Sequence, residues 1–221
     1  MDCLKISQLW DLDNTIAKDI FQGLTYPWEV LARIKDFIYE LGVKLPGDEY
    51  DNPSDGVWIA RDAKVAPTAY IGCPCIIGRN AEVRHCAFIR GSAIVGDNAV
   101  VGNSTELKNV ILFNNVQVPH YNYVGDSVLG FRAHMGAGSI TSNVKSDKKN
   151  VEIHVNGQNI ETGLKKIGAM IGDNVEIGCG SVLNPGTVIG PGTNVYPLSS
   201  VRGYVPAGSI YKKQGEVATK L

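Results

Sequence analysis

The sequence lacks a surplus of charge of either sign, because its 221 residues include 21 Lys plus Arg and 22 Asp plus Glu. A balanced chain has no overall attraction to a polyanion, so we do not expect nucleic-acid binding. The chain also lacks an uninterrupted apolar stretch of about 18 residues, which a membrane-spanning helix requires. We therefore expect a soluble protein with no membrane partner.

Cysteine is scarce as well, with five residues in the chain, and no basic-then-apolar leader opens the sequence. These two features argue against secretion and a disulfide framework, so we predict a reduced, cytoplasmic protein. Cys73 and Cys75 fit small buried positions at a strand corner. The four histidines share no ligand spacing, so we expect no metal, and a three-histidine zinc site in a trimer is the alternative.

What the chain has instead is an apolar residue at every sixth position, in two blocks. The positions are Ile59, Val65, Ile71, Ile77, Val83, Ile89, Val95, Val101, Leu107 and Phe113, then Ile171, Ile177, Leu183, Ile189, Val195 and Val201. A period of six is a multiple of the strand period of two and does not fit the helical period of 3.6. Hexapeptide repeats of this kind are typical of a parallel β-helix.

Glycine often follows the repeated apolar residue, as at Gly72, Gly78 and Gly96. This pattern resembles the left-handed parallel β-helix of the hexapeptide-repeat acyltransferases, whose coils have three six-residue sides. The resemblance implies that residues eighteen apart lie one above the other. We therefore predict an all-β fold, a left-handed parallel β-helix of hexapeptide repeats, over residues 51–206, with a C-terminal tail at 207–221.

The first 50 residues follow a different pattern. Apolar residues from Trp28 to Leu41 recur at helical spacing after Pro27 and before Gly42, which predicts an amphipathic helix. A shorter helix is expected near residues 12–21, and 46–54 has the composition of a linker. We predict an N-terminal helical cap on the open end of the β-helix, where strand edges need cover. A docking surface for another chain is the alternative.

The six-residue period breaks between about Gln117 and Gly168. Residues 151–162 alternate around Asn156-Gly157, which predicts an inserted β-hairpin. Irregular segments on a rigid scaffold commonly carry function. We therefore look for site residues within this excursion and on the coils beside it.

Two cations and a histidine lie close to the break. Arg90 and Lys108 follow the repeated apolar residue and are eighteen residues apart. Three interpretations are open. The two cations are merely solvated, they share a carboxylate such as Glu106, or they jointly hold an anion such as a sugar phosphate. His120 is a candidate general base, because the ordinary histidine pKa of about 6.5 allows it to take a proton near neutral pH.

Four runs of sequence carry a more specific resemblance, over about residues 88–205. They are GNSTELKN (Gly102–Asn109), PHYNYVGDSVLG (Pro119–Gly130), MGAGSITSN (Met135–Asn143) and IGDNVEIGCGSVLNPGTVIG (Ile171–Gly190). Together they are similar to the acetyltransferase domain of the bifunctional enzyme that makes UDP-N-acetylglucosamine from glucosamine 1-phosphate. The excursion is more like that of archaeal sugar-phosphate acetyltransferases, in which a similar hairpin precedes the last coils.

The resemblance implies roles for the matching residues. Arg90 and Lys108 match the basic residues that hold the sugar phosphate, Tyr123 matches a substrate-binding tyrosine and His120 matches the catalytic base. It further implies acetyl-CoA as the cofactor and a homotrimer with the site between subunits. The residues matched at the cofactor site are Ala137, through its backbone, Asn143, and Cys179, which stands in place of a serine.

The chain departs from the family pattern at several positions. His134 replaces an asparagine that binds the sugar, and Val144 replaces an aromatic residue. A further active-site lysine corresponds to Lys149, Lys165 or Lys166, because the hairpin shifts the alignment. These departures leave the acceptor sugar less defined than the reaction.

The implied reaction is N-acetylation of an amino-sugar phosphate. His120 would deprotonate the attacking amine, and N–H groups of the turn at 136–139 would bind the oxyanion. The nucleotidyltransferase domain has no counterpart before Ile59, where no glycine-rich phosphate loop occurs, so we expect no nucleotidyltransferase activity. The alternatives are a non-catalytic partner of a separate sugar nucleotidyltransferase and an acetyltransferase for another acceptor.

Overall fold

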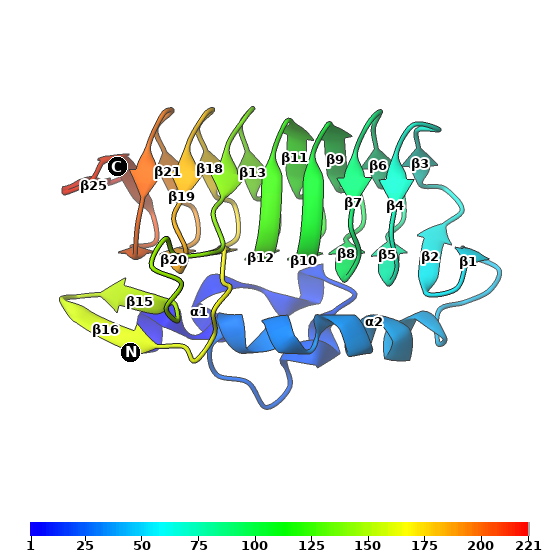
Figure 1. Ribbon diagram of the computed structural model, residues 1–221, viewed down its shortest axis with the longest axis horizontal. Helices are drawn as coiled ribbons and strands as arrows, with labels where there is room; N and C mark the ends of the chain where they lie inside the picture. The colour runs from blue at the N-terminus through cyan, green and yellow to red at the C-terminus, as the bar shows by residue number, and fades with distance from the viewer. Residues whose placement is uncertain (221) are drawn as a thin grey trace.

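The computed structural model describes residues 1–220 and shows an elongated β-solenoid with helical segments along one side (Figure 1). Strands of successive coils pair in parallel and build three faces. The prediction of a hexapeptide-repeat β-solenoid is confirmed.

We name the faces by what lies on them. The covered face contains β2 (Val57–Ala60), β5 (Cys75–Ile77), β8 (Ala93–Val95), the second halves of β10 (Glu106–Leu112) and β12 (Tyr123–Leu129), β17 (Ala169–Ile171), β20 (Thr187–Ile189) and β23 (Tyr204–Val205). The polar face contains β3 (Lys64–Val65), β6 (Glu82–Val83), β9 (Val100–Asn103), β11 (Gln117–His120), β13 (His134–Met135), β18 (Glu176–Ile177), β21 (Asn194–Val195) and β24 (Ser209–Lys213). The open face contains β4 (Tyr70–Ile71), β7 (Phe88–Ile89), the first halves of β10 and β12, β14 (Ile140–Thr141), β19 (Val182–Leu183) and β22 (Ser200–Val201).

The first coils have eighteen residues, since Cys75 pairs with Ala93, but the next two have seventeen. Ala93 pairs with Val110 and Val110 with Ser127, so one residue is missing from each coil. The shortening lies between the open and covered faces, because β10 and β12 run through that corner without a separate turn. We call this edge the shortened corner.

The shortening corrects one position of the sequence pattern. Leu112, and not Phe113, pairs with Val95 and takes the tenth place in the repeat. Phe113 lies in the following turn, where it is fully buried. Its ring packs against Trp10 and Phe21 of the N-terminal segment, at centroid distances of 5.6 and 6.0 Å.

The corner between the covered and polar faces repeatedly uses asparagine. Asn80, Asn98 and Asn115 have φ of 52°, 57° and 62°, in the left-handed region. Asparagine enters this region more readily than most non-glycine residues, because its short polar side chain can bond locally. These residues therefore allow the chain to turn at a regular place in each coil.

The covered face presents only apolar side chains outward on its paired strands, from Trp58 through Ile76, Ile94, Ile111, Val128, Met170 and Val188 to Tyr204. All but Tyr204 are buried. The N-terminal segment lies over the early and middle coils, and the hairpin lies over the last ones (Figure 1). Burial of these side chains is the driving force that attaches both segments.

The N-terminal segment is made of short helices. They are η1 (Asp2–Leu4), α1 (Ile6–Leu9), η2 (Leu12–Asn14), η3 (Lys18–Phe21), η4 (Pro27–Ala32) and α2 (Ile34–Gly42). The helix expected from Pro27 is thus divided at Arg33 into a 3-10 helix and an α-helix. Gly42 ends α2, and its missing side chain leaves room for the Trp58 ring, because a Cβ there would lie 2.4 Å from that ring.

The segment covers a flank of the solenoid and not its open end, which corrects our expected position of the cap (Figure 1). The Trp10 indole donates to the Ile171 carbonyl at 2.8 Å. The Asp173 carboxylate accepts from the backbone N–H of Asp11 at 2.8 Å and of Phe131 at 2.7 Å. Burial raises the pKa of Asp173 above its usual value, and these two hydrogen bonds oppose the shift.

Antiparallel strands cover the two ends of the stack. β1 (Tyr50–Ser54) pairs with β2, so residues 50–54 form a strand and not the end of a linker. β24 extends the polar face beyond residue 206, where we expected the tail to begin, and β25 (Glu216–Thr219) pairs with it. Because unpaired strand edges are prone to association, these strands supply the protection that we had assigned to the helices.

The excursion forms an antiparallel pair of strands, β15 (Glu152–Val155) and β16 (Gln158–Glu161). Asn156 and Gly157 make the turn with φ of 49° and 75°, as a two-residue hairpin requires. Ile153 is fully buried beneath the hairpin.

The five cysteines are free, and Cys75 is buried whereas Cys73 is exposed, unlike the buried pair that we expected. Burial raises the pKa of the Cys75 thiol to about 12. Among residues 1–220, none of the helices has the length and apolar character needed to cross a bilayer.

Candidate active site

His120 lies at the corner between the polar and open faces, in a column formed by the same position of successive coils. The column continues to Ala137 and Cys179, the residues matched to the cofactor site. Backbone hydrogen bonds join the successive coils of this column. Gly138 N–H donates to the His120 carbonyl at 3.0 Å, and Gly180 N–H donates to the Ala137 carbonyl at 2.8 Å. We call this edge the histidine corner.

Asn122 fixes the backbone around His120 from inside the coil. Its side chain is buried, and its Oδ1 accepts from His120 N–H at 3.1 Å. Its Nδ2 donates to the carbonyls of Gly136 and Ser139 at 2.9 and 3.1 Å. Asn122 therefore ties the base to the turn of the next coil, and it was not among our predicted site residues.

The turn at 136–139 has less donor capacity than we expected from its sequence. Gly136, Gly138 and Ser139 already donate their N–H groups to backbone carbonyls of this chain. Within residues 1–220, Ala137 is the member of this turn whose N–H has no such acceptor. The oxyanion site expected here is thus reduced to one available backbone donor.

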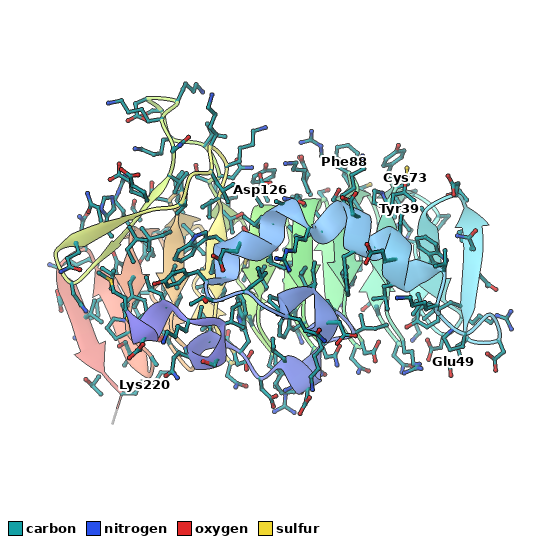
Figure 2. All side chains as sticks on the ribbon, turned by 90° about the horizontal axis from the view of Figure 1, so that it is seen from below. Tyr39, Glu49, Cys73, Phe88, Asp126 and Lys220 are labelled. Carbon is teal, nitrogen blue, oxygen red and sulfur yellow. The ribbon has the colours of Figure 1, made fainter. Side chains whose placement is uncertain are left out.

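A second cluster lies across the open face, at the shortened corner. Asp126 is buried and accepts from Lys108 Nζ at 2.9 Å, Asn109 Nδ2 at 2.9 Å and Asn143 Nδ2 at 2.6 Å. Tyr123 joins the cluster through a 3.2 Å contact from Asn143 Nδ2 to its hydroxyl, and burial raises the pKa of Tyr123. Asp126 lies on the edge of the solenoid beside α2, and the excursion departs from this same edge (Figure 2).

Arg90 lies next to Lys108 on the open face, as the eighteen-residue spacing predicts, because Ile89 pairs with Leu107. Arg90 Nη1 donates to Glu106 Oε1 at 2.9 Å, so both cations have carboxylate partners within the chain. The two cations and the two carboxylates have no net charge. Glu106 therefore pairs with Arg90, but it is not shared with Lys108 as the carboxylate alternative proposed, because Lys108 pairs with Asp126.

The structure does not bring His134 to the open face. His134 lies on the polar face, where its Nδ1 is 2.7 Å from Glu176 Oε2. Lys149 and Lys166 are exposed in the excursion, and neither side chain has a hydrogen bond or ion pair within residues 1–220. These three residues thus stand apart from the Asp126 cluster.

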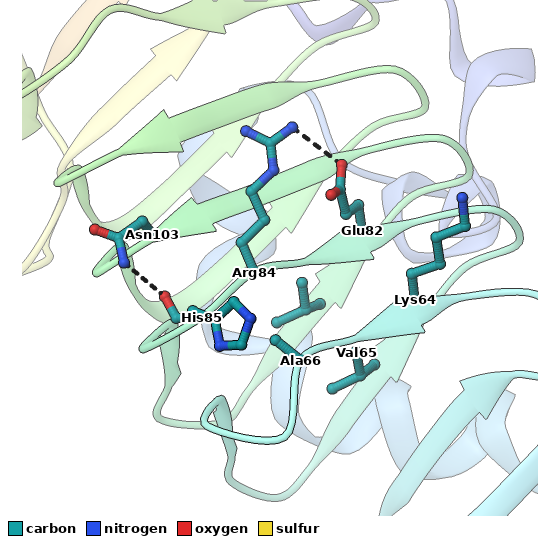
Figure 3. A pocket seen from close by; sticks show the side chains of 8 residues that line it. Lys64, Val65, Ala66, Glu82, Arg84, His85 and Asn103 are labelled. Carbon is teal, nitrogen blue, oxygen red and sulfur yellow. Dashed lines mark hydrogen bonds and ion pairs between the residues drawn. The ribbon is translucent and has the colours of Figure 1, made fainter.

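A hollow of about 520 Å³ lies beside the histidine corner, in the coils before His120 (Figure 3). Its lining includes Lys64, Glu82, Arg84, His85 and Asn103, and Asn103 is the strand partner of His120. Arg84 is paired with Glu82 at 3.0 Å, which lowers the pKa of Glu82. None of the lining residues was predicted to be a site residue from the sequence.

The arrangement can support proton transfer between groups bound on the open face. The His120 side chain is exposed, and its imidazole has no hydrogen-bond partner within residues 1–220, so it is free to accept a proton from a ligand. Over the same residues, no cluster of three potential metal ligands occurs. The remaining site groups are amide, hydroxyl and cationic groups that bind polar substrates.

Asp126 is the main site residue that sequence reasoning missed. It lies eighteen residues after Lys108, so a signal was present in the same spacing that relates Lys108 to Arg90. The true strand partner of Lys108 is Gly125, because of the seventeen-residue coil. The carboxylate of the following residue then turns back into the corner, a detail that spacing does not contain.

Comparison with known proteins identifies relatives over most of the chain. The bifunctional protein GlmU of Methanococcus maripaludis strain C5 is 32% identical over 79% of this chain and 43% of its own length. That of strain C7 is 33% identical over 90% of this chain and 49% of its own length. The chain therefore spans less than half the length of these curated relatives. No family model matches the sequence.

Solved structures give weaker similarity. A hexapeptide transferase family protein from Anaplasma phagocytophilum has a TM-score of 0.42 and 16% identity, covering 76% of this chain and 81% of its own. The acetyltransferase domain of PglB from Neisseria gonorrhoeae, in complex with acetyl coenzyme A, has a TM-score of 0.34 and 19% identity, covering 69% and 52%. Both TM-scores are below 0.5.

Proposed function

We propose that this chain, a hexapeptide-repeat protein related to part of the bifunctional GlmU proteins, is an acetyl-CoA-dependent N-acetyltransferase for an amino-sugar phosphate. The observation that carries the proposal is the histidine corner, where His120, Ala137 and Cys179 occupy one column of adjacent coils. A base and the residues matched to cofactor binding are thus neighbours. Asn143 and Lys108 lie across the same narrow face.

The reaction requires a base because an amino sugar is protonated in water and its ammonium form has no lone pair for attack. His120 takes one proton from the ammonium, and the free amine then adds to the thioester carbonyl. The tetrahedral intermediate collapses, the C–S bond breaks, and the departing coenzyme thiolate takes up the second proton that the nitrogen loses, while His120 returns its proton to solvent. Ala137 N–H is the available backbone donor for the developing oxyanion.

Arg90 and Lys108 are the proposed ligands of the acceptor phosphate. Within residues 1–220, each cation makes one hydrogen bond to a carboxylate, so further N–H donors remain for an anion. Binding of a phosphate here orients the amine for attack, which converts remote binding energy into rate. His134, Lys149 and Lys166 keep their proposed substrate-binding roles on the polar face and in the excursion.

The site is proposed to be completed by another copy of the chain. His120 is exposed at a corner and His134 lies on the polar face, so an opposing wall would enclose a ligand that contacts both. A homotrimer with left-handed coils, as the resemblance implies, would supply that wall. Residues from Asn143 onward would then serve the His120 of a neighbouring subunit.

The direct test follows acetyl-CoA consumption with glucosamine 1-phosphate. We expect wild-type activity and a loss of about 10²- to 10⁴-fold in His120→Ala, the usual contribution of a general base. His154→Ala on the hairpin is the matched control and should keep full activity, because within residues 1–220 its imidazole bonds only to Asn159 of the same hairpin. Full activity of His120→Ala contradicts the mechanism, and an inactive wild type contradicts the function.

The ion pairs favour a second candidate, transfer to an acceptor without a phosphate. Glu106 and Asp126 neutralise both cations, so an incoming phosphate must compete with them. A panel of amino sugars with and without the phosphate decides between the two acceptors. An unchanged kcat/KM on removal of the phosphate supports the second.

A further inference from the structure

The shortened corner holds a carboxylate that is almost completely enclosed, with a side-chain exposure of 5%. Both of its oxygens are used, since Oδ1 accepts from Lys108 and Asn109 and Oδ2 accepts from Asn143. Three side-chain donors from different positions of the chain therefore converge on this one carboxylate. Buried charges are stable only when they are paired in this way.

The carboxylate fixes the orientation of the Asn143 amide. An ionised carboxylate only accepts hydrogen bonds, so the Asn143 NH₂ group must face Asp126. The second hydrogen of that group points to the Tyr123 hydroxyl at 3.2 Å. Asn143 Oδ1 is then the polar atom left for a ligand, and it suits an amide N–H such as those of the pantetheine arm of coenzyme A.

The same carboxylate fixes Lys108. The Lys108 side chain is 30% exposed, so its ammonium is held at the surface of the corner and keeps two N–H donors for an anion. Asn109 also donates to the Leu31 carbonyl at 3.3 Å, which ties the carboxylate to the N-terminal segment. The corner is therefore braced from the covered side.

We propose that Asp126 is a positioning residue that holds Lys108 for the acceptor and Asn143 for the cofactor in one arrangement. The proposal rests on the proposed function, since it assigns these two residues to the two substrates. Asp126 itself touches neither substrate. Replacement of Asp126 is expected to weaken the binding of both substrates, that of the acceptor through Lys108 and that of acetyl-CoA through Asn143.

The test is a pair of double-mutant cycles around Asp126→Asn. In the wild-type background we expect KM to rise about tenfold for acetyl-CoA and for the acceptor, the effect of losing a charge-assisted hydrogen bond. In Asn143→Ala, adding Asp126→Asn should change the KM for acetyl-CoA less than about twofold while the acceptor KM still rises. In Lys108→Met the pattern should be reversed.

The exchange Asp126→Asn with Asn143→Asp supplies a second variant, which restores a donor and an acceptor across the corner. It should return the KM for acetyl-CoA to within about threefold of wild type, because a carboxylate at 143 still offers an acceptor to the ligand. Asp97→Asn is the control, since the Asp97 carboxylate lies at a corner on another edge of the solenoid and accepts a backbone N–H, from Arg79 at 2.8 Å, in place of the side-chain donors of Asp126. It should leave both KM values unchanged.

Unchanged KM values in Asp126→Asn, fully additive effects in both cycles, or no rescue by the exchange would overturn the proposal. A wild type without activity on any amino sugar contradicts the proposed function instead. The positioning role is then decided by calorimetric binding of coenzyme A. The role is supported if Asp126→Asn lowers the affinity for coenzyme A and this loss depends on the presence of Asn143. It is rejected if neither coenzyme A binding nor this dependence on Asn143 is observed.

Discussion

The covered face and the open face belong to the same coils and share one strand register, yet they have opposite surroundings. At the outward position of the covered face, Ile94 and Ile111 are fully buried beneath the N-terminal segment. At the corresponding position of the open face, Phe88 is 42% exposed and Glu106 lies at the surface. The inward residues are mostly apolar on both faces, with a few buried polar residues such as Asn122 and Ser127 among them.

The difference shows that one set of residues encodes the repeat and another set encodes what covers each face. Inward residues set the coil, and outward residues determine whether a face receives a covering segment or a ligand. The shortened corner lies between the two faces, so the proposed site is bordered by the solvent on one side and by a packed segment on the other. This position explains how a carboxylate as buried as Asp126 can sit beside exposed cations.

The largest expected effect concerns matched truncations on the two faces. Ile94→Ala should lower the free energy of unfolding by about 2–5 kcal/mol, because the side chain is fully buried and leaves a cavity. Phe88→Ala, at the exposed position, should cost less than about 1 kcal/mol. Denaturant unfolding measures both, and equal losses would remove the distinction between the faces.

A smaller loss is expected at the attachment of the N-terminal segment. Trp10→Phe removes the buried 2.8 Å bond to the Ile171 carbonyl but keeps a ring against Phe21 and Phe113. The Ile171 carbonyl still accepts from Gly130 N–H, so we expect a loss of only about 1–2 kcal/mol in unfolding free energy. Acetyl-CoA turnover should be unchanged, and a drop in kcat without a drop in stability would show that the segment acts on the site.

Much of the solenoid could be predicted from the sequence because the inward residues repeat. The covering of one flank was also readable, since Cys75-Ile76-Ile77, Ala93-Ile94-Val95 and Ala169-Met170-Ile171 are continuous apolar runs. A strand with apolar residues on both sides is buried on both sides. Our prediction rested on the need to cover strand edges and therefore placed the helices at an end.

The site was less predictable, for a physical reason that Phe113 and Asp126 illustrate. A period of six cannot reveal that one residue is missing at a corner when the next residue is also apolar, as Phe113 is after Leu112. The deletion changes which side chains meet, and Asp126 reaches Lys108 only through the resulting turn. Histidine chemistry pointed to His120 and the resemblance supplied Asn143, whereas their bonds to Asn122 and Asp126 required the three-dimensional arrangement.

A modest effect on phosphate affinity is expected when Arg90 on the open face loses its carboxylate partner. Glu106→Gln removes the carboxylate from Arg90, so affinity for inorganic phosphate should rise two- to fivefold, the range of an exposed ion pair. Glu176→Gln on the polar face is the control and should leave phosphate binding unchanged. Calorimetry measures both affinities, and equal gains would mean that only the overall charge matters.

The smallest effect is a pH dependence with opposite signs at two carboxylates. Burial raises the pKa of Asp173 above 3.8, so its stabilising contribution is complete below about pH 3.8 and is lost as pH rises through the folded value. The Arg84 partner lowers the pKa of Glu82 below 4.5, so its contribution is present above that pH and is lost as pH falls. Unfolding free energies of Asp173→Asn and Glu82→Gln, each relative to wild type, should therefore change in opposite directions between pH 3 and 7. Parallel slopes would show that a carboxylate at the edge of the covering segment experiences the same surroundings as one at the open surface.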